Sequence, residues 1–234
     1  MIKFLQQGIS ASVLAINKSG MAQQNIFLEI YTTLYNHYGP QNWWPAESPL
    51  EMVVGAILTQ NTSWKNVAKA ITCLKAVNLM TIESLSGSSN EELAGCIRSA
   101  GYYNLKAKRL RNLLNMLCQE FEGSLQRLLE EELCSCREKL LQVNGIGEET
   151  ADSILLYACG HPIFVVDTYT HRVFSRHNLL EEECTYGDIQ ERFMDNLPED
   201  AQLFNEYHAL IVRVAKEYCK KTNPLCSDCP LQGM

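Results

Sequence analysis

Asp167 is a residue whose type and position suit electrostatic or acid–base chemistry. It follows the apolar pair Val165-Val166 and precedes Thr168-Tyr169-Thr170, where a new helix is expected to begin. An Asp at that place is a good N-cap, because its side chain accepts hydrogen bonds from the backbone N–H groups of the first turn. A carboxylate in such a place can also take part in catalysis. Capping and catalysis are compatible, so Asp167 is our catalytic candidate.

A glycine turn precedes this carboxylate in the chain. The segment Leu141-Gln-Val-Asn-Gly145-Ile-Gly147-Glu-Glu-Thr150 predicts a helix, a tight turn and a second helix, a helix-hairpin-helix over about residues 134–159. Glycines at 145 and 147 permit positive φ and a close approach of the backbone, so their N–H groups and the following helix N-terminus can meet a phosphate without lysine. The alternative is a plain corner with glycine as a C-cap, and the turn alone does not decide between the two.

The charge balance limits how such a chain could bind nucleic acid. It has 234 residues, with 20 Lys plus Arg against 27 Asp plus Glu and a net charge of −7, which argues against a globally basic field. A local basic face remains, since the stretch from 98 to 111 carries five positive charges and no acid. Lys106 and Arg109 in that stretch are our candidate DNA contacts. A solvated helix face is the alternative.

All three tryptophans, Trp43, Trp44 and Trp64, fall within two short segments. Bases flipped out of a duplex are commonly held between aromatic faces. The three side chains are therefore predicted to form a base pocket. Any one of them alone would be interpreted more simply as a core aromatic.

The elements that must position these residues are helices. Apolar residues recur at three- and four-residue spacing, and no strand alternation is evident, so the predicted class is all-α with two lobes and an active-site cleft between them. Gly160-His161-Pro162 forces a break before the apolar run 163–166. The predicted division is a loose extension over 1–20, one lobe from 21–46 plus 162–234, and a helical barrel lobe over 47–161. Helices are expected at about 63–77, 90–98, 103–120, 133–142, 148–159, 168–177, 185–197 and 201–218.

The hairpin followed by the Asp helix and a cysteine-rich tail resembles the helix-hairpin-helix DNA glycosylases of the endonuclease III superfamily. The resemblance covers roughly residues 25–232. The segments Trp43-Trp44-Pro45, Gly55–Thr62 and Gly145–Cys159 most closely resemble the type III 3-methyladenine DNA glycosylases. This resemblance implies a base-excision-repair enzyme that hydrolyses the N-glycosidic bond of alkylated purines in double-stranded DNA, with Asp167 as the catalytic carboxylate.

The resemblance also implies roles for three further residues. Glu149 stands where the bifunctional enzymes of the superfamily carry the lysine that attacks the sugar. A carboxylate cannot form a Schiff base, so a monofunctional enzyme is expected. A second interpretation of Glu149 is favourable placement at a helix N-terminus. Gln60 is expected to enter the gap left by the extruded base, with helix C-capping as the alternative, and Tyr102 stands at the position of the wedge that props open the opposite strand.

Ten cysteines are present, and most lie singly in apolar stretches, so a disulfide framework is not expected. Cys219, Cys226 and Cys229 have six and then two residues between them, matching the first three ligands of the superfamily's [4Fe-4S] cluster. The pattern places a fourth cysteine at position 235, one past Met234. We expect an incomplete cluster loop, in which the last ligand is missing, another group substitutes or no cluster forms. A zinc site that includes His208 or Cys184 is the second interpretation.

Two other functions stay open at this stage. One is an endonuclease III-like glycosylase for oxidised or mismatched bases, with or without lyase activity, and the other is a helix-hairpin-helix DNA-binding module without catalysis. The apolar run within residues 1–20 is too short to span a membrane. A monomer in a reducing, prokaryotic cytoplasm, associated with the nucleoid, is expected.

Overall fold

The computed structural model describes residues 25–234, so the expected extension over 1–20 lies outside the described residues. Helices dominate residues 25–234 and no strand occurs among them, which confirms the all-α class. The helices are α1 (Ile26–Tyr38), α2 (Pro49–Thr59), α3 (Trp64–Ala76), α4 (Ile82–Gly87), α5 (Asn90–Cys96), α6 (Tyr103–Phe121), α7 (Leu125–Leu129), α8 (Leu133–Gln142), α9 (Glu148–Ile154), α10 (Thr168–Arg176), α11 (Tyr186–Asn196) and α12 (Ala201–Glu217). The 3-10 helices η1 (Arg98–Ala100) and η3 (Cys226–Asp228) and the π-helix η2 (Leu155–Cys159), which continues α9, complete them.

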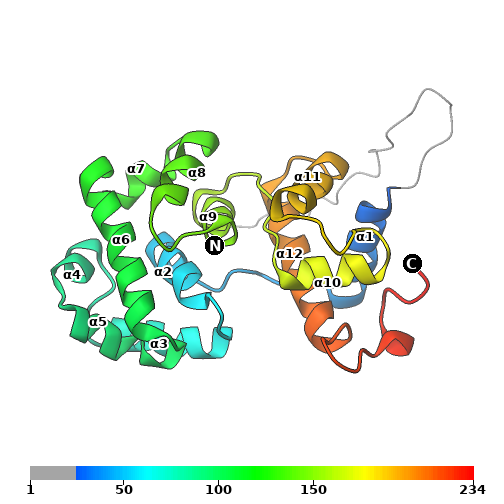
Figure 1. Cartoon of the computed structure of the whole chain (residues 1–234), viewed down its shortest axis with the longest axis horizontal. Helices are drawn as coiled ribbons and strands as arrows, with labels where there is room; N and C mark the ends of the chain where they lie inside the picture. The colour runs from blue at the N-terminus through cyan, green and yellow to red at the C-terminus, as the bar shows by residue number, and fades with distance from the viewer. Residues whose placement is uncertain (1–24) are drawn as a thin grey trace, which may run out of the picture.

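The helices form two groups, with α2 to α9 on one side and α1, α10, α11 and α12 on the other (Figure 1). Although α1 begins the described chain, it packs against α11 and α12. Its apolar face supplies Phe27, which stacks on Phe174 of α10 with the ring centroids 5.5 Å apart. Phe164 stacks in turn on Phe193 of α11 at 4.0 Å. An aromatic core therefore joins α1 to α10 and α11.

The other group is built around α2. Residues 51–58 are all buried, as expected for a helix that is covered on every side, and α2 packs against α3, α6, α9 and η2. Ser48 caps the N-terminus and Pro49 begins the first turn, where its missing N–H costs nothing. The C-terminal end of α2 is thereby fixed beside the hairpin between α8 and α9.

A buried polar network joins the two groups. The carboxylate of Asp152 on α9 is fully buried and accepts hydrogen bonds from Arg137 Nε at 2.7 Å, Tyr186 Oη at 2.8 Å and Gln190 Nε2 at 2.7 Å. Gln190 also donates to the carbonyl of Phe164 at 2.7 Å. Because a buried carboxylate needs such partners, α8, α9 and α11 are held in one arrangement.

Most expected helices agree with the structure within a few residues. Two short helices, α4 and α7, were not expected, because five or six residues are too few to show a helical period. The predicted break after Gly160 is present, and residues 163–166 are buried and lie outside any helix before α10 begins. Within residues 25–234, no helix has the length and apolar character needed to cross a membrane.

Candidate active site

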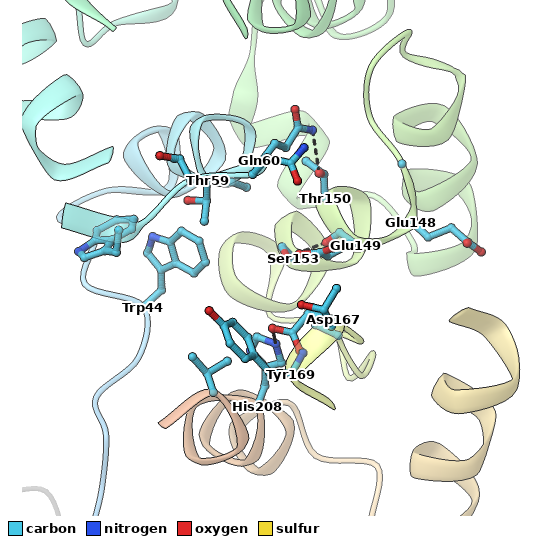
Figure 2. A pocket seen from close by; sticks show the side chains of 18 of the residues that line it. Trp44, Thr59, Gln60, Glu148, Glu149, Thr150, Ser153, Asp167, Tyr169 and His208 are labelled. Carbon is cyan, nitrogen blue, oxygen red and sulfur yellow. Dashed lines mark hydrogen bonds and ion pairs between the residues drawn. The ribbon is translucent and has the colours of Figure 1, made fainter. Parts of the chain in front are cut away.

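A cavity of about 940 Å³ lies where the two groups of helices meet (Figure 2). Its wall combines the end of α2, the start of α3, the hairpin, the start of α10 and one face of α12. The candidates Asp167, Glu149, Gln60, Arg109, Gly145, Gly147 and the three tryptophans all line it. Residues far apart in the sequence are thus brought to one place.

Asp167 is the N-cap of α10, and only its Oδ1 takes part in the capping hydrogen bonds. Its Oδ1 accepts hydrogen bonds from the backbone N–H of Tyr169 at 2.9 Å, the N–H of Thr170 at 2.8 Å and the Thr170 hydroxyl at 3.0 Å. Burial raises the pKa of this carboxyl, but His208 and the Thr170 hydrogen bonds outweigh it, so the pKa falls below its usual value. The carboxylate is therefore ionised at neutral pH, as the catalytic candidate requires.

His208 faces the free oxygen of Asp167. The side chain is only 7% exposed, and its Nε2 lies 3.5 Å from Asp167 Oδ2. Its Nδ1 lies 2.7 Å from the hydroxyl of Tyr157, whose pKa is raised well above the usual value, mainly by burial and then by the Asp167 charge. The phenol therefore keeps its proton. Figure 2 shows His208 on α12, directly opposite Asp167.

The two adjacent glutamates of α9 point in different directions. Both residues line the cavity, but the Glu148 side chain points away from Asp167, with its Oε1 3.6 Å from Arg137 Nη2, whereas Glu149 lies beside Asp167 (Figure 2). The pKa of Glu149 is raised, first by loss of solvation and then by the Asp167 charge, with His208 acting in the opposite direction. The cavity thus holds two neighbouring carboxyls, of which Glu149 takes up a proton more readily.

The tryptophans form one aromatic wall. The Trp44 ring packs edge-on against Trp43 at 5.5 Å and against Trp64 at 5.0 Å, and lies 5.4 Å from the Tyr157 ring. Gly55 allows this packing, because a Cβ there would lie 3.4 Å from the Trp44 indole nitrogen. The indole nitrogens of Trp43 and Trp44 are buried and have no hydrogen-bond partner among the described residues. The wall therefore offers flat faces and two N–H donors.

Gln60 ties α2 to the hairpin. It is the C-cap residue of α2, and its side-chain amide donates to the carbonyl of Gly145 at 3.0 Å and to the Thr150 hydroxyl at 2.9 Å. Its Oε1 accepts a hydrogen bond from Arg109. Gln60 thus ends α2, and its side chain lies beside the hairpin, where it would also have to lie to fill the gap left by an extruded base.

The hairpin glycines differ from one another. Gly145 has φ of +100°, and a Cβ there would overlap the Arg109 side chain. Gly147, in contrast, has φ of −100° and serves as the N-cap of α9, so only Gly145 uses the positive φ that glycine permits. A Cβ at Gly147 would meet no atom within 4 Å, which leaves its backbone open to a ligand.

Lys106 does not lie where a phosphate contact would need it. It is 1% exposed, and its Nζ donates to the carbonyls of Leu58 and Ala100, each at 2.8 Å. Burial and the nearby Arg109 charge lower its pKa to about 8. The prediction of a direct DNA contact is therefore corrected: Lys106 satisfies the carbonyls at the ends of α2 and η1. The guanidinium of Arg111 likewise donates to backbone carbonyls, of Leu85, Ser86 and Ser88.

Tyr102 lies apart from the cavity, on the turn that begins α6. It has φ of +46° and is 73% exposed, the largest exposure among the described large hydrophobic side chains. It follows Gly101, whose φ is +69°. The wedge prediction requires an exposed side chain of this kind, and it stays a prediction.

The cysteine tail follows α12. Cys219 is buried and its Sγ accepts a hydrogen bond from Arg176 at 3.3 Å, whereas Cys226 is exposed. Burial raises the pKa of the Cys229 thiol, followed by a backbone hydrogen bond that lowers it and by the charges of the other two cysteines, which raise it. No group of three or more His, Cys, Asp or Glu side chains in residues 25–234 is arranged to hold a metal ion. The three thiols as they lie do not form a ligand set.

The two residues considered as additional zinc ligands lie elsewhere. His208 belongs to the cavity, and the eleven positions that separate it from Cys219 correspond to about 16 Å along a helix. Cys184 lies in an acidic depression with Glu181, Asp188 and Arg192. Among the described residues, neither side chain forms a ligand set with the three thiols. Sequence reasoning also missed the contact of His208 with Tyr157 and Asp167, because residues 41 to 51 positions apart show no local pattern.

The comparisons with known proteins agree with this geometry. The family model for the HhH-GPD superfamily base excision DNA repair protein matches residues 54–199. A Methanocaldococcus jannaschii protein named "Putative DNA repair glycosylase MJ1434" is 47% identical over 87% of this chain and 93% of its own length. The crystal structure of Helicobacter pylori 3-methyladenine DNA glycosylase bound to 1,N6-ethenoadenine superposes with a TM-score of 0.72 at 31% identity, covering 82% of this chain and 97% of that one. A non-covalent endonuclease III–DNA complex shares the fold, with a TM-score of 0.77 at 22% identity over 90% of this chain and 94% of that one.

Proposed function

Because the chain belongs to the HhH-GPD superfamily of base excision DNA repair proteins and is a DNA N-glycosylase, we propose that it excises alkylated purines, 3-methyladenine-like bases, from double-stranded DNA without cutting the strand. The observation that carries this proposal is the composition of the cavity. An aromatic wall faces two carboxyls, and a glutamate, Glu149, stands where the resemblance places a lysine in the bifunctional enzymes.

The aromatic wall suits a flipped, positively charged base. An N-alkylated purine carries positive charge, which is attracted to the faces of Trp44 and Trp64 and to the negative charge of Asp167. A normal base is neutral and gains less from the same surfaces. Selectivity for alkylated bases then follows from charge, and the hydrogen bonds that distinguish one normal base from another are not needed.

Asp167 acts on the sugar. As the bond between C1′ and the base nitrogen lengthens, positive charge spreads over C1′ and the ring oxygen, and the free Oδ2 stabilises it electrostatically. Glu149 adds negative charge on the same side of the cavity. Water then attacks C1′, and the product is an abasic site on an intact strand.

The DNA would be held at the mouth of the cavity. The hairpin offers the open backbone of Gly147 and the N-terminus of α9, which suit a phosphate. Tyr102 would prop the duplex open from the α6 side, and Gln60 would fill the space of the extruded base after leaving Gly145 and Thr150. Most of these contacts need no lysine, which reconciles DNA binding with a net charge of −7.

The test is a single-turnover incubation with duplex DNA that carries one methylated adenine, with and without subsequent hot alkali. We expect base release, with strand cutting only after alkali. Parallel duplexes carry an oxidised pyrimidine or a mismatched base, which the alternative functions would require. Release from those duplexes alone would contradict alkylpurine specificity. Tight binding to an abasic analogue without any release would indicate a binding module.

Borohydride reduction tests the monofunctional part of the proposal. We expect no trapped protein–DNA adduct, because a carboxylate cannot form an imine. Lys216 lines the cavity, with its Nζ 5.6 Å from the centroid of the Tyr169 ring, and is the residue to test if an adduct forms. An adduct that disappears in Lys216→Met would assign lyase chemistry to that amine and contradict the proposal.

A further inference from the structure

His208 places an unused polar atom at the reacting side of the cavity. Its side chain is 7% exposed, and its Nε2 has no hydrogen-bond partner among the described residues. The neighbouring Asp167 Oδ2, at 3.5 Å, is slightly too far for a good direct hydrogen bond. A buried polar atom without a partner is costly, so this position calls for a ligand.

The contact with Tyr157 bears on which ring nitrogen of His208 carries a proton. The Tyr157 hydroxyl lies 2.7 Å from Nδ1 and keeps its proton, so it can donate a hydrogen bond to Nδ1. The imidazole proton then resides on Nε2, which becomes a donor aimed at the space beside Asp167. The pair thus presents a donor and an acceptor a short distance apart: Nε2–H and the carboxylate oxygen.

We propose that His208 and Asp167 together bind the water that attacks the sugar, and that Tyr157 fixes the His208 tautomer needed for this. The proposal rests on the proposed hydrolysis at Asp167. The water oxygen accepts the Nε2–H hydrogen bond and donates one hydrogen to Asp167 Oδ2, which leaves a lone pair directed at C1′. A molecule held between two fixed groups is already oriented for attack.

The atoms of the step balance without a further reactant. The C1′–N bond breaks with its electron pair going to the base, so an alkylated cationic purine leaves neutral. The water oxygen forms the new bond to C1′, and its proton passes to Asp167 Oδ2 and then to solvent. His208 remains a donor throughout and is neither oxidised nor alkylated.

Two substitutions distinguish the role of Nδ1 of His208 from that of Nε2. His208→Asn keeps a side-chain oxygen near the Nδ1 position, where it can accept from Tyr157, but has no atom near Nε2. His208→Gln reaches the Nε2 position with an amide N–H. We expect excision in His208→Asn to slow by about tenfold to a hundredfold and His208→Gln to recover part of that loss. Thermal melting and affinity for an abasic analogue monitor folding and DNA binding in both variants.

Added methanol provides a readout that a purely structural role would not change. Methanol competes with water for C1′ and yields a methyl deoxyriboside in place of an abasic site. If His208 holds the water, the methanol fraction rises in His208→Asn relative to the wild type and falls back in His208→Gln. A wild-type rate and product ratio in His208→Asn would overturn the proposal. Equal rate losses in both variants with unchanged product ratios would also overturn it.

The same measurements test the water site independently of the proposed substrate specificity. The product ratio is measured on whichever base the wild type releases, alkylated, oxidised or mismatched. Release of another base with the expected His208 effects would contradict alkylpurine specificity and support the water site. Failure of the wild-type chain to release any of these bases would overturn both.

Discussion

At the residue scale, the two oxygens of Asp167 have different tasks. Oδ1 receives the three hydrogen bonds that cap α10, and Oδ2 is left for the reaction. Asp167→Asn preserves the cap, since Asn is as good an N-cap as Asp, but removes the negative charge. Because the lowered pKa means that folding favours the ionised carboxylate, we expect a lower melting temperature at pH 7, together with a loss of excision of about a hundredfold or more in single-turnover assays.

A second variant shows what the cap itself contributes. Asp167→Ala removes both tasks and should additionally lower stability by about 1 kcal/mol. Full excision by Asp167→Asn would disprove the catalytic assignment, whereas an unchanged melting temperature at pH 7 would contradict the lowered pKa of this carboxyl.

Glu149 makes the stability of the protein depend on pH in a predictable direction. Its pKa in the folded protein lies above the ordinary value, so the folded state binds this proton more readily than the unfolded state does. The ionised carboxylate therefore costs stability above the raised pKa, and the cost is absent below the ordinary value, where both states are protonated. Glu149→Gln should melt at a higher temperature than the wild type at pH 7, with the difference vanishing near pH 4.

Glu148→Gln is the control, because Glu148 lies in the same first turn of α9 but faces Arg137. Glu148 is subject to the same helix N-terminus but does not face Asp167, so we expect no rise in melting temperature at pH 7 for Glu148→Gln. If Glu149→Gln were less stable than the wild type at pH 7, the unfavourable interaction with Asp167 would be refuted.

The sequence could predict those site residues that stand in a recognisable local pattern. Asp167 and the tryptophans stand in short segments whose spacing is informative, and the structure brings all of them to the cavity. Lys106 stands in an equally informative basic stretch, yet it is buried, because the carbonyls that it satisfies belong to residues 6 and 48 positions away. Charge alone does not show which lysines a helix turns inward.

At the element scale, the hairpin turn combines two glycines with different constraints. Gly145→Ala would introduce a Cβ at φ of +100°, against the Arg109 side chain that also holds Gln60. We expect a loss of stability of about 1–3 kcal/mol, measured by thermal or urea unfolding. Gly147→Ala has an allowed φ of −100° and no nearby atoms, so its stability should change little.

Binding measurements complete that pair of variants. A Cβ at Gly147 would stand where we propose that a phosphate approaches, so Gly147→Ala should weaken DNA binding while leaving the melting temperature unchanged. Wild-type affinity in Gly147→Ala would exclude this backbone as a phosphate contact. An undisturbed melting temperature in Gly145→Ala would show that Arg109 can move aside at little cost.

Helices were the most predictable elements, because amphipathic segments of nine or more residues repeat their pattern several times. Their partners were not predictable in the same way. The network of Asp152 with Arg137, Tyr186 and Gln190 connects α9 to α8 and α11, and each of its members is an ordinary surface residue type in the sequence. Such contacts depend on packing, which periodicity does not encode.

At the scale of the whole molecule, the cavity exists only because both groups of helices contribute to it. Asp167 and His208 come from α10 and α12, whereas Glu149, Gln60 and the hairpin come from the other group. The sequence indicated a two-lobed chain through the break at Gly160, but it could not show that α12 would bring a histidine to the catalytic carboxylate. That contact is a property of the assembled fold.

The overall charge leads to a prediction about salt. Each phosphate contact made by a Lys or Arg adds roughly −0.9 to the slope of log binding constant against log salt concentration. Of the five positive residues between 98 and 111, Lys106 and Arg111 are committed to backbone carbonyls, so this segment can supply at most three contacts and a slope of roughly −2.7. An acidic protein that binds largely through backbone N–H groups should therefore show a shallow salt dependence.

Two lysines of α6 test this directly. Lys108 is exposed, so Lys108→Met should reduce the slope by roughly 1 and leave the melting temperature unchanged. Lys106→Met should leave the slope unchanged and destabilise the fold by about 2 kcal/mol, because two buried carbonyls lose their donor. Salt titrations of duplex binding, with unfolding measured in parallel, distinguish the two. A smaller slope in Lys106→Met would mean that this side chain leaves the core and contacts a phosphate when DNA binds. The number of phosphate contacts could then not be derived from the structure without DNA.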